Sequence, residues 1–296
     1  MPRSLAPSLL TAFALAAALA APAFAADGQP AGVGLFSRSE DSPVVVTPGI
    51  WLTHGFAQTV TESENSGKIK QGANLMATAD LDLRLPGRPW LGLWARGGTT
   101  VANRKAESDT ADNIDSDFTL GEANVVLTLA GRGSPFFESE EYPRSTLDLY
   151  AGGRYFRERY DADLVTGVRR EVDARWVGPQ IGMRGEWYLQ DTYDLDALRG
   201  WSLTLRGAVM PWMQMDSTDR RDGVKAFELE SNRAYGGDAA AGLAWRRGPI
   251  GFGLGFEAQF LRADSGHEED AFGTTRSVLE ARSNRYGAFL TLSINF

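Results

Sequence analysis

Hydrophobic and polar residues alternate with a period of two through most of the chain beyond residue 49. Between Ala73 and Leu85, for example, one face carries alanine and leucine while the other carries Asn74, Thr78, Asp80, Asp82 and Arg84. This alternation is typical of β-strands that separate an apolar from a polar environment. A shift by one residue would move charges onto the apolar face, so the register is well defined.

The alternation predicts ten strands, each long enough for the roughly 9 to 11 residues that a tilted strand needs to cross a bilayer. We therefore expect an all-β fold, a single antiparallel up-and-down transmembrane β-barrel of about ten strands, with twelve as the alternative. A soluble β-sandwich would have strands of about five or six residues. The predicted strands are 50–62, 72–85, 90–105, 118–130, 146–161, 172–189, 201–215, 231–246, 250–264 and 282–296.

The connections between these strands predict the orientation of the barrel. Two of them, 85–89 and 246–249, are tight turns rich in proline and glycine, and such short turns face the periplasm in outer-membrane barrels. We expect polar outward loops at 63–71, 106–117, 162–171, 216–230 and 265–281. Aromatic residues near strand ends, including Trp187, Trp201 and Trp245, are expected at the membrane interfaces.

The first residues resemble an export signal. Arg3 precedes an apolar stretch that is too short to span a bilayer as a helix, and Ala23-Phe24-Ala25 has the small residues of a cleavage site. We expect residues 1–25 to be a cleavable signal peptide, 26–49 an N-terminal lead-in, and 50–296 an outer-membrane β-barrel. The expected location is the cell outer membrane.

The last strand alternates up to a terminal aromatic residue. Its apolar face carries Tyr286, Leu290, Leu292, Ile294 and Phe296. This pattern resembles the C-terminal assembly signal of Gram-negative outer-membrane β-barrel proteins. The resemblance implies a barrel that the barrel-assembly machinery inserts among outer-membrane lipid and lipopolysaccharide, and we expect a monomer.

Composition narrows the possible partners. The chain has no cysteine and has 38 acidic against 30 basic residues, with a formal net charge of -8. The acidic balance argues against a nucleic-acid partner. The mean hydropathy of -0.25 does not argue against a barrel, because only every second residue of a barrel strand faces lipid.

The alternation places charged residues of both signs inside the barrel. At ten strands the interior is narrow, so we interpret this set as a filled polar lumen held by ion pairs; a narrow channel for small solutes is the alternative. Large inward neighbours would include Trp94, Trp176, Trp212 and Phe289. The predicted polar network comprises Asp80, Asp82, Arg84, Arg96, Glu122, Asp148, Arg154, Glu158, Arg184, Glu186, Arg206, Asp238, Glu257 and Arg285.

Candidate chemistry is sparse. Only two histidines occur, His54 in the first predicted strand and His267 in an acidic loop. We therefore predict no catalytic residues, no metal site and no cofactor. Cation binding by the acidic loop around His267 is a minor alternative.

Three short sequences resemble stretches in the omptin family of outer-membrane proteases, namely 150–155, 177–183 and 230–236. Omptins use an acidic pair and an Asp-x-His pair to activate water at the outer rim. The corresponding loop here, 216–222, contains no histidine, and Asp80 and Asp82 lie toward the periplasmic end of their strand. The function we expect is therefore surface interaction or an envelope-structural role; a narrow solute channel is the first alternative and an omptin-like hydrolase the second.

The closed barrel and its final strand lead to a first prediction. The folded protein should migrate faster than the boiled protein on SDS gels, because a closed barrel exposes no strand edge to detergent. Deleting Phe296 should lower the yield of this heat-modifiable form in outer-membrane fractions. Equal yields with and without Phe296 would contradict the role given to the last strand.

Overall fold

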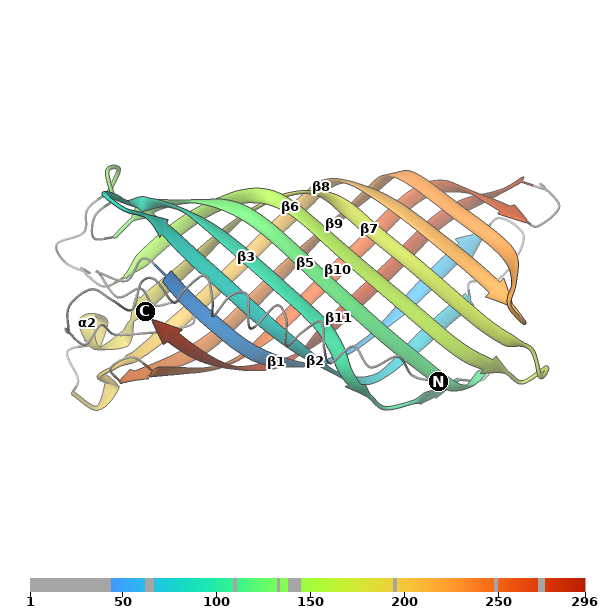
Figure 1. Ribbon diagram of the computed structural model, residues 1–296, viewed down its shortest axis with the longest axis horizontal. Helices are drawn as coiled ribbons and strands as arrows, with labels where there is room; N and C mark the ends of the chain where they lie inside the picture. Colours follow the sequence, from blue (N-terminus) through green and yellow to red (C-terminus); the bar gives the residue numbers. More distant parts are fainter. Residues whose placement is uncertain are drawn as a thin grey trace.

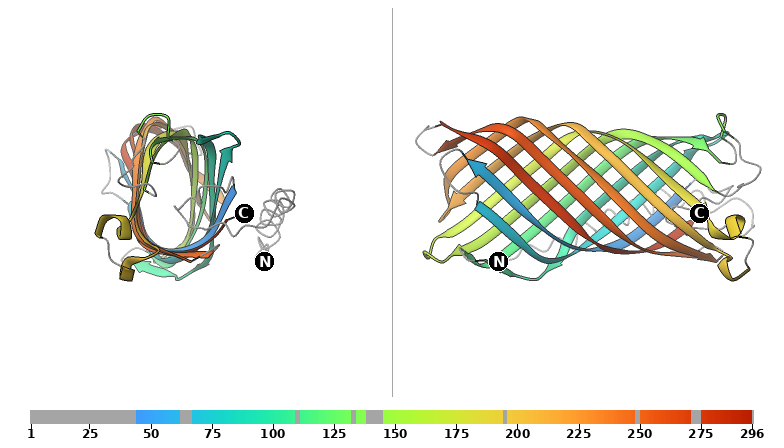
Figure 2. Two further views of the ribbon diagram at one scale, coloured as in Figure 1. Left: turned by 90° about the vertical axis from the view of Figure 1, so that its left-hand side faces the viewer. Right: turned by 180° about the vertical axis from the view of Figure 1, so that it is seen from behind.

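The structure, a computed structural model, describes residues 44–61, 67–108, 111–131, 134–137, 145–193, 196–247, 250–270 and 275–295. These residues form one antiparallel sheet that closes on itself, because β1 pairs with β11 at one seam and β3 pairs with β5 at the other. Ten strands make the wall of the barrel, and the short β4 adds to its rim (Figure 1). Seen along its axis, the sheet is a closed ring (Figure 2). The predicted ten-stranded barrel is confirmed.

The strands follow one another around the ring in chain order. Their bounds are β1 (Val44–Thr61), β2 (Gly67–Leu85), β3 (Arg88–Asn103), β4 (Ala106–Ser108), β5 (Ala111–Ala130), β6 (Thr146–Leu164), β7 (Arg169–Tyr188), β8 (Trp201–Arg221), β9 (Val224–Arg247), β10 (Ile250–Asp270) and β11 (Thr275–Asn295). Two short helical segments, α2 (Leu189–Tyr193) and η2 (Asp196–Leu198), connect β7 to β8. In the described part of the chain, no helix is long and apolar enough to cross a membrane.

Most wall strands are about twice as long as a bilayer requires. They range from the 16 residues of β3 to the 24 residues of β9, whereas a crossing takes about 9 to 11. The barrel therefore continues beyond the lipid at one end, opposite to α2 and to the turn between β2 and β3 (Figure 1). The orientation predicted from the short turns makes this the extracellular end.

At the boundary between lipid and water, the apolar face and the polar face of a strand change places. In β6 the outward residues before Tyr155 are apolar, such as Leu149, and those after it are charged, such as Arg157. On the inner face the polar residues come first and the apolar residues follow. Phe156 and Tyr160 are buried there, beyond the polar part of the lumen. Outside the membrane the barrel is thus organised like a soluble protein, with an apolar interior and a charged surface.

This exchange explains why the predicted outward loops are too long. Residues 216–221 and 224–230 continue β8 and β9, and a two-residue turn at Asp222 and Gly223 joins them. Most of the loop predicted at 265–281 likewise belongs to β10 and β11. Polar residues on the water-exposed face of a strand resemble a loop in the sequence, although their backbones remain paired.

Two further details differ from the prediction. Strand β1 begins at Val44 rather than at residue 50, so the end of the expected lead-in is already part of the wall. The side chain of Trp212 points outward and is highly exposed, because the register of β8 against β9 shifts between Met210 and Met213. A β-bulge at this point reverses the inward and outward positions.

The C-terminal strand is part of the seam. From Val45 to Thr61, β1 pairs with β11, and Tyr286, Leu290 and Leu292 face outward. Phe296, the expected signal peptide 1–25 and most of the lead-in lie outside the described residues.

The seam generates a second prediction. A Cβ atom added at Gly287 in β11 would collide with the Leu52 carbonyl oxygen of β1, whereas at Gly97 in β3 it would meet no atom within 4 Å. Gly287→Ala should therefore destabilise the barrel by about 1 to 3 kcal/mol. Gly97→Ala, the matched control, should change the free energy of unfolding by less than about 0.5 kcal/mol. Both can be measured by urea denaturation in detergent, and equal midpoints would rule out close packing at the seam.

Candidate functional site in the barrel lumen

The charged residues inside the barrel form three tiers along its axis. The inner tier, nearest the periplasmic end, joins Arg84 and Arg184 to Asp82 and Asp148. Arg84 Nη2 lies 2.6 Å from Asp148 Oδ2, and Arg84 Nε lies 2.9 Å from Asp82 Oδ1. The hydroxyl of Thr128 donates to the other oxygen of Asp148 at 2.6 Å. Alternating charges thus connect β2, β6 and β7.

The middle tier crosses the lumen. Arg96 on β3 donates two hydrogen bonds to Glu257 on β10, at 2.9 and 2.8 Å, although three other strands separate β3 from β10 along the shorter way around the ring. Arg206 on β8 lies 2.8 Å from the same carboxylate. Bidentate arginine–carboxylate pairs combine charge with fixed geometry. Glu257 therefore ties two opposite parts of the wall together.

The middle tier has a second centre at Arg154 on β6. Its guanidinium pairs with Asp238 on β9 and lies 3.4 Å from Glu122 on β5. Glu122 also accepts a hydrogen bond from Gln180 at 3.3 Å. All four groups are buried. This centre links the neighbouring strands β5, β6 and β7 to β9, which is not adjacent to any of them.

Trp94 packs between the inner and middle tiers. The guanidinium carbons of Arg184 and Arg206 lie 5.4 and 5.6 Å from its ring centroid. Tyr150 meets it edge-to-face at 5.0 Å between ring centroids. An aromatic face within about 6 Å of a cation stabilises that cation. Trp94 therefore fills the space between the two tiers and also stabilises both guanidinium groups.

The outer tier is a single ion pair in an aromatic surrounding. Arg285 on β11 pairs with Glu158 on β6, and its guanidinium lies 3.9 Å from the Phe118 ring centroid and 4.0 Å from that of Phe156. Glu158 also accepts hydrogen bonds from Tyr160 at 2.7 Å, from Trp176 at 3.0 Å and from Ser283 at 2.9 Å. The donors around this carboxylate come from three strands, β6, β7 and β11.

An apolar cluster surrounds the outer tier, and the sequence pattern did not predict this cluster. It contains Met210, Met213, Met215, Leu229, Leu261, Phe118, Phe156, Tyr160 and Trp176. The lumen is therefore polar within the membrane and largely apolar beyond it. The sequence signal for this cluster is the row of charged residues on the outward face of the same strands, because an outer face that meets water implies an apolar interior.

The structure places the predicted network as follows. All fourteen residues face the lumen; each of its six arginines lies within ion-pair distance of a carboxylate. Asp80 and Asp82 are the more accessible members, with 19% of each side chain exposed. Glu186 is fully buried and accepts a hydrogen bond from Ser202 at 2.6 Å. No predicted member of the set lies on the lipid side.

The described structure places two of the residues considered for catalysis, His54 and Asp219, on different strands, β1 and β8. His54 lies on the outer surface of β1, where it pairs with Tyr286 of β11. The backbone of His267 belongs to β10, and Asp219 is buried against Arg170, 2.7 Å from its Nη2. A general base needs a partner within hydrogen-bond reach. Among the described residues, no group of three or more potential ligands could hold a metal ion.

Comparison with solved structures identifies barrels of the same type. The outer membrane protease OmpT from Escherichia coli superimposes with a TM-score of 0.67 at 12% identity, covering 86% of this chain and 97% of that chain. Neisserial surface protein A (TM-score 0.30, 12% identity, 86% and 98% coverage) and the NalP translocator domain from Neisseria meningitidis (0.41, 11%, 98% and 98%) also match. The latter two likenesses are too distant to support an argument.

No protein-family model matches the chain. A search of curated proteins also gives no match. At 12% identity the likeness to OmpT concerns the fold alone. The chain has the fold of an outer-membrane β-barrel, a closed antiparallel barrel of ten wall strands.

The lumen generates a third prediction. Arg206→Ala would leave buried Glu257 and Asp238 without one of their cations, and breaking a buried pair on one side costs about 3 to 5 kcal/mol. Arg220→Ala is the matched control, because its guanidinium lies 3.8 Å from Glu171 with 45% of its side chain exposed. The control should cost less than about 0.5 kcal/mol. Similar unfolding midpoints in denaturant would refute a stabilising role for the lumen network.

Proposed function

We propose that this protein is a closed, non-conducting outer-membrane barrel that acts through its extracellular part, in surface interaction or in envelope architecture. The observation that carries the proposal is the bridge from Arg96 to Glu257, which spans the lumen between β3 and β10. Paired charges oppose ion passage because an ion must either displace a partner or cross between satisfied groups. The aromatic outer tier adds a second barrier around Glu158 and Arg285.

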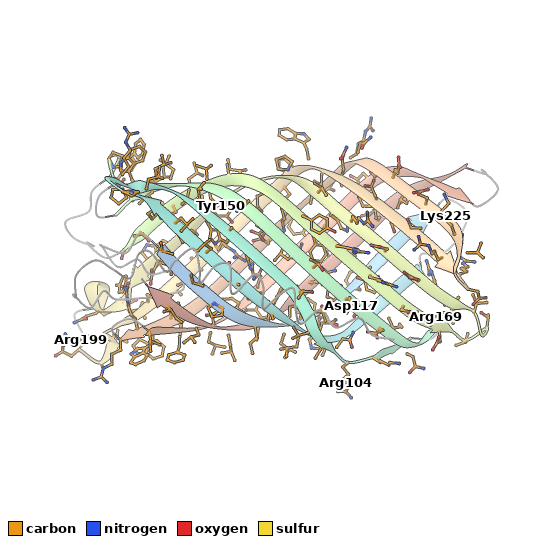
Figure 3. The ribbon with its side chains drawn as sticks, viewed as in Figure 1. Arg104, Asp117, Tyr150, Arg169, Arg199 and Lys225 are labelled. Atoms are coloured by element: carbon orange, nitrogen blue, oxygen red, sulfur yellow. The ribbon has the colours of Figure 1, made fainter. Side chains whose placement is uncertain are left out.

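The extracellular part offers a charged outer surface. On β6 and β7, Arg157 Nε donates to Asp173 at 2.8 Å, and Arg159 lies 2.8 Å from Glu171. Arg169 and Lys225 lie toward this end of the barrel, opposite to Arg199 (Figure 3). These arginines are partly exposed, so phosphate and carboxylate groups of lipopolysaccharide are suitable partners for them. Lipopolysaccharide contact is part of this proposal.

A narrow solute channel is the competing function. It would require a continuous polar path, whereas the described lumen changes from paired charges to an aromatic and methionine-rich region. An omptin-like hydrolase ranks third. The likeness to OmpT supports a common fold, and the sequence 216–222 contains no histidine.

The fourth prediction concerns conductance. The refolded protein should give no ion-conducting steps in planar lipid bilayers, because the middle tier closes the lumen. Arg96→Ala should introduce small conductance steps, since it removes the bridge to Glu257 while leaving the wall unchanged. Heat-modifiable migration of both proteins would establish that they are folded. Steps of equal size in both proteins would contradict the closed lumen and favour the channel.

A further inference from the structure

The lipid-facing wall of the barrel contains an apolar groove. It extends over β6 to β10 and has a volume of about 540 Å³. Gly207, Ala239 and Ala241 line it as small residues, while Trp187 and Phe256 line it as large ones. The small residues leave a hollow between the larger outward side chains.

The floor of the groove is open toward the lipid. A Cβ atom added at Gly207 would find its nearest atom, the Asp238 carbonyl oxygen, at 3.7 Å. At Gly185, by contrast, the added atom would meet the Trp187 indole at 2.5 Å. Trp187 therefore covers one glycine as a wall of the groove, and Gly207 is left uncovered as part of its floor.

Two rows of outward side chains connect the groove to the periplasmic end. Each row passes from a small residue through leucine to a tryptophan, and the two tryptophans are direct partners across β8 and β9. An exposed arginine follows each tryptophan at the membrane boundary, and Figure 3 shows Arg199 at this end of the barrel. The rows are Gly207, Leu205, Leu203, Trp201 and Arg199 on the β8 side, and Ala239, Ala241, Leu243, Trp245 and Arg247 on β9.

We propose that the groove and the pair Arg199 and Arg247 form a binding site for one glycerophospholipid of the periplasmic leaflet. An acyl chain lies in the groove, and the phosphate lies between the two guanidinium groups. Burial of methylene groups stabilises the chain, and charge-assisted hydrogen bonds hold the phosphate. Tryptophan side chains suit the interface between these two parts of the lipid.

Position and charge favour this occupant over the alternatives. The groove lies next to the strand ends that face the periplasm, so the lipopolysaccharide of the outer leaflet is on the wrong side of the membrane. A second barrel copy in the same orientation, related by a two-fold axis, would bring its own Arg199 and Arg247 toward this pair. The like charges would repel one another, whereas a phosphate neutralises them.

The fifth prediction tests the groove. Native mass spectrometry of the detergent-solubilised barrel, titrated with palmitoyl-oleoyl phosphatidylglycerol, should detect one retained lipid. Ala241→Leu and Gly207→Leu should weaken binding roughly fourfold for each methylene that they displace. Ala123→Leu is the matched control, because Ala123 is an exposed outward residue of β5 away from the groove. It should leave lipid binding unchanged.

The arginines are tested separately. Replacing both Arg199 and Arg247 with glutamine should weaken lipid binding about tenfold or more, since each loses a charge-assisted hydrogen bond. Arg88→Gln is the control, because Arg88 is exposed at the periplasmic turn between β2 and β3. Heat-modifiable migration of every variant excludes misfolding.

Three results would overturn the proposal. The first is equal lipid binding by groove variants and controls. The second is a retained lipid that proves to be lipopolysaccharide when both are supplied. The third is a barrel dimer that Ala241→Leu dissociates, because the groove would then be an interface between copies.

Discussion

The change of solvent along each strand is the constraint on which this structure depends. Within the membrane the outer face must be apolar and the lumen can be polar, whereas beyond it the outer face meets water and the interior becomes apolar. Tyr155 marks this change on β6, between Leu149 and Arg157 on the outside. Because backbone pairing continues across the boundary, one barrel serves both environments.

The charged lumen follows from this constraint. Within the membrane the inner face is the only place where charged side chains avoid lipid, and a narrow ring then forces them to meet. Desolvation makes an unpaired charge costly there, so each arginine is held by carboxylates from other strands. The Arg96–Glu257 bridge shows how such pairs connect strands that share no backbone hydrogen bonds.

Beyond the membrane the same narrow ring is filled differently. Phe118 and Phe156 enclose the guanidinium of Arg285, and Glu158 collects donors from several strands. An isolated ion pair in apolar surroundings contributes little net stability but is costly to break. Its many partners fix the relative positions of the strands, which suits a part of the barrel that receives no support from lipid. The apolar groove over β6 to β10 is a further feature of the lipid-facing wall.

The sequence by itself determined the barrel, its number of strands and the lumen-facing side of Asp80, Arg96 and Glu257, because alternation directly records which face of a strand meets lipid. It did not determine where the strands end, because polar residues on a water-exposed face resemble loops. It also misplaced Trp212, since a bulge shifts the alternation without leaving a pattern. Only the tertiary structure decided which charges pair and where a groove forms, because these contacts join residues that closure of the ring brings together.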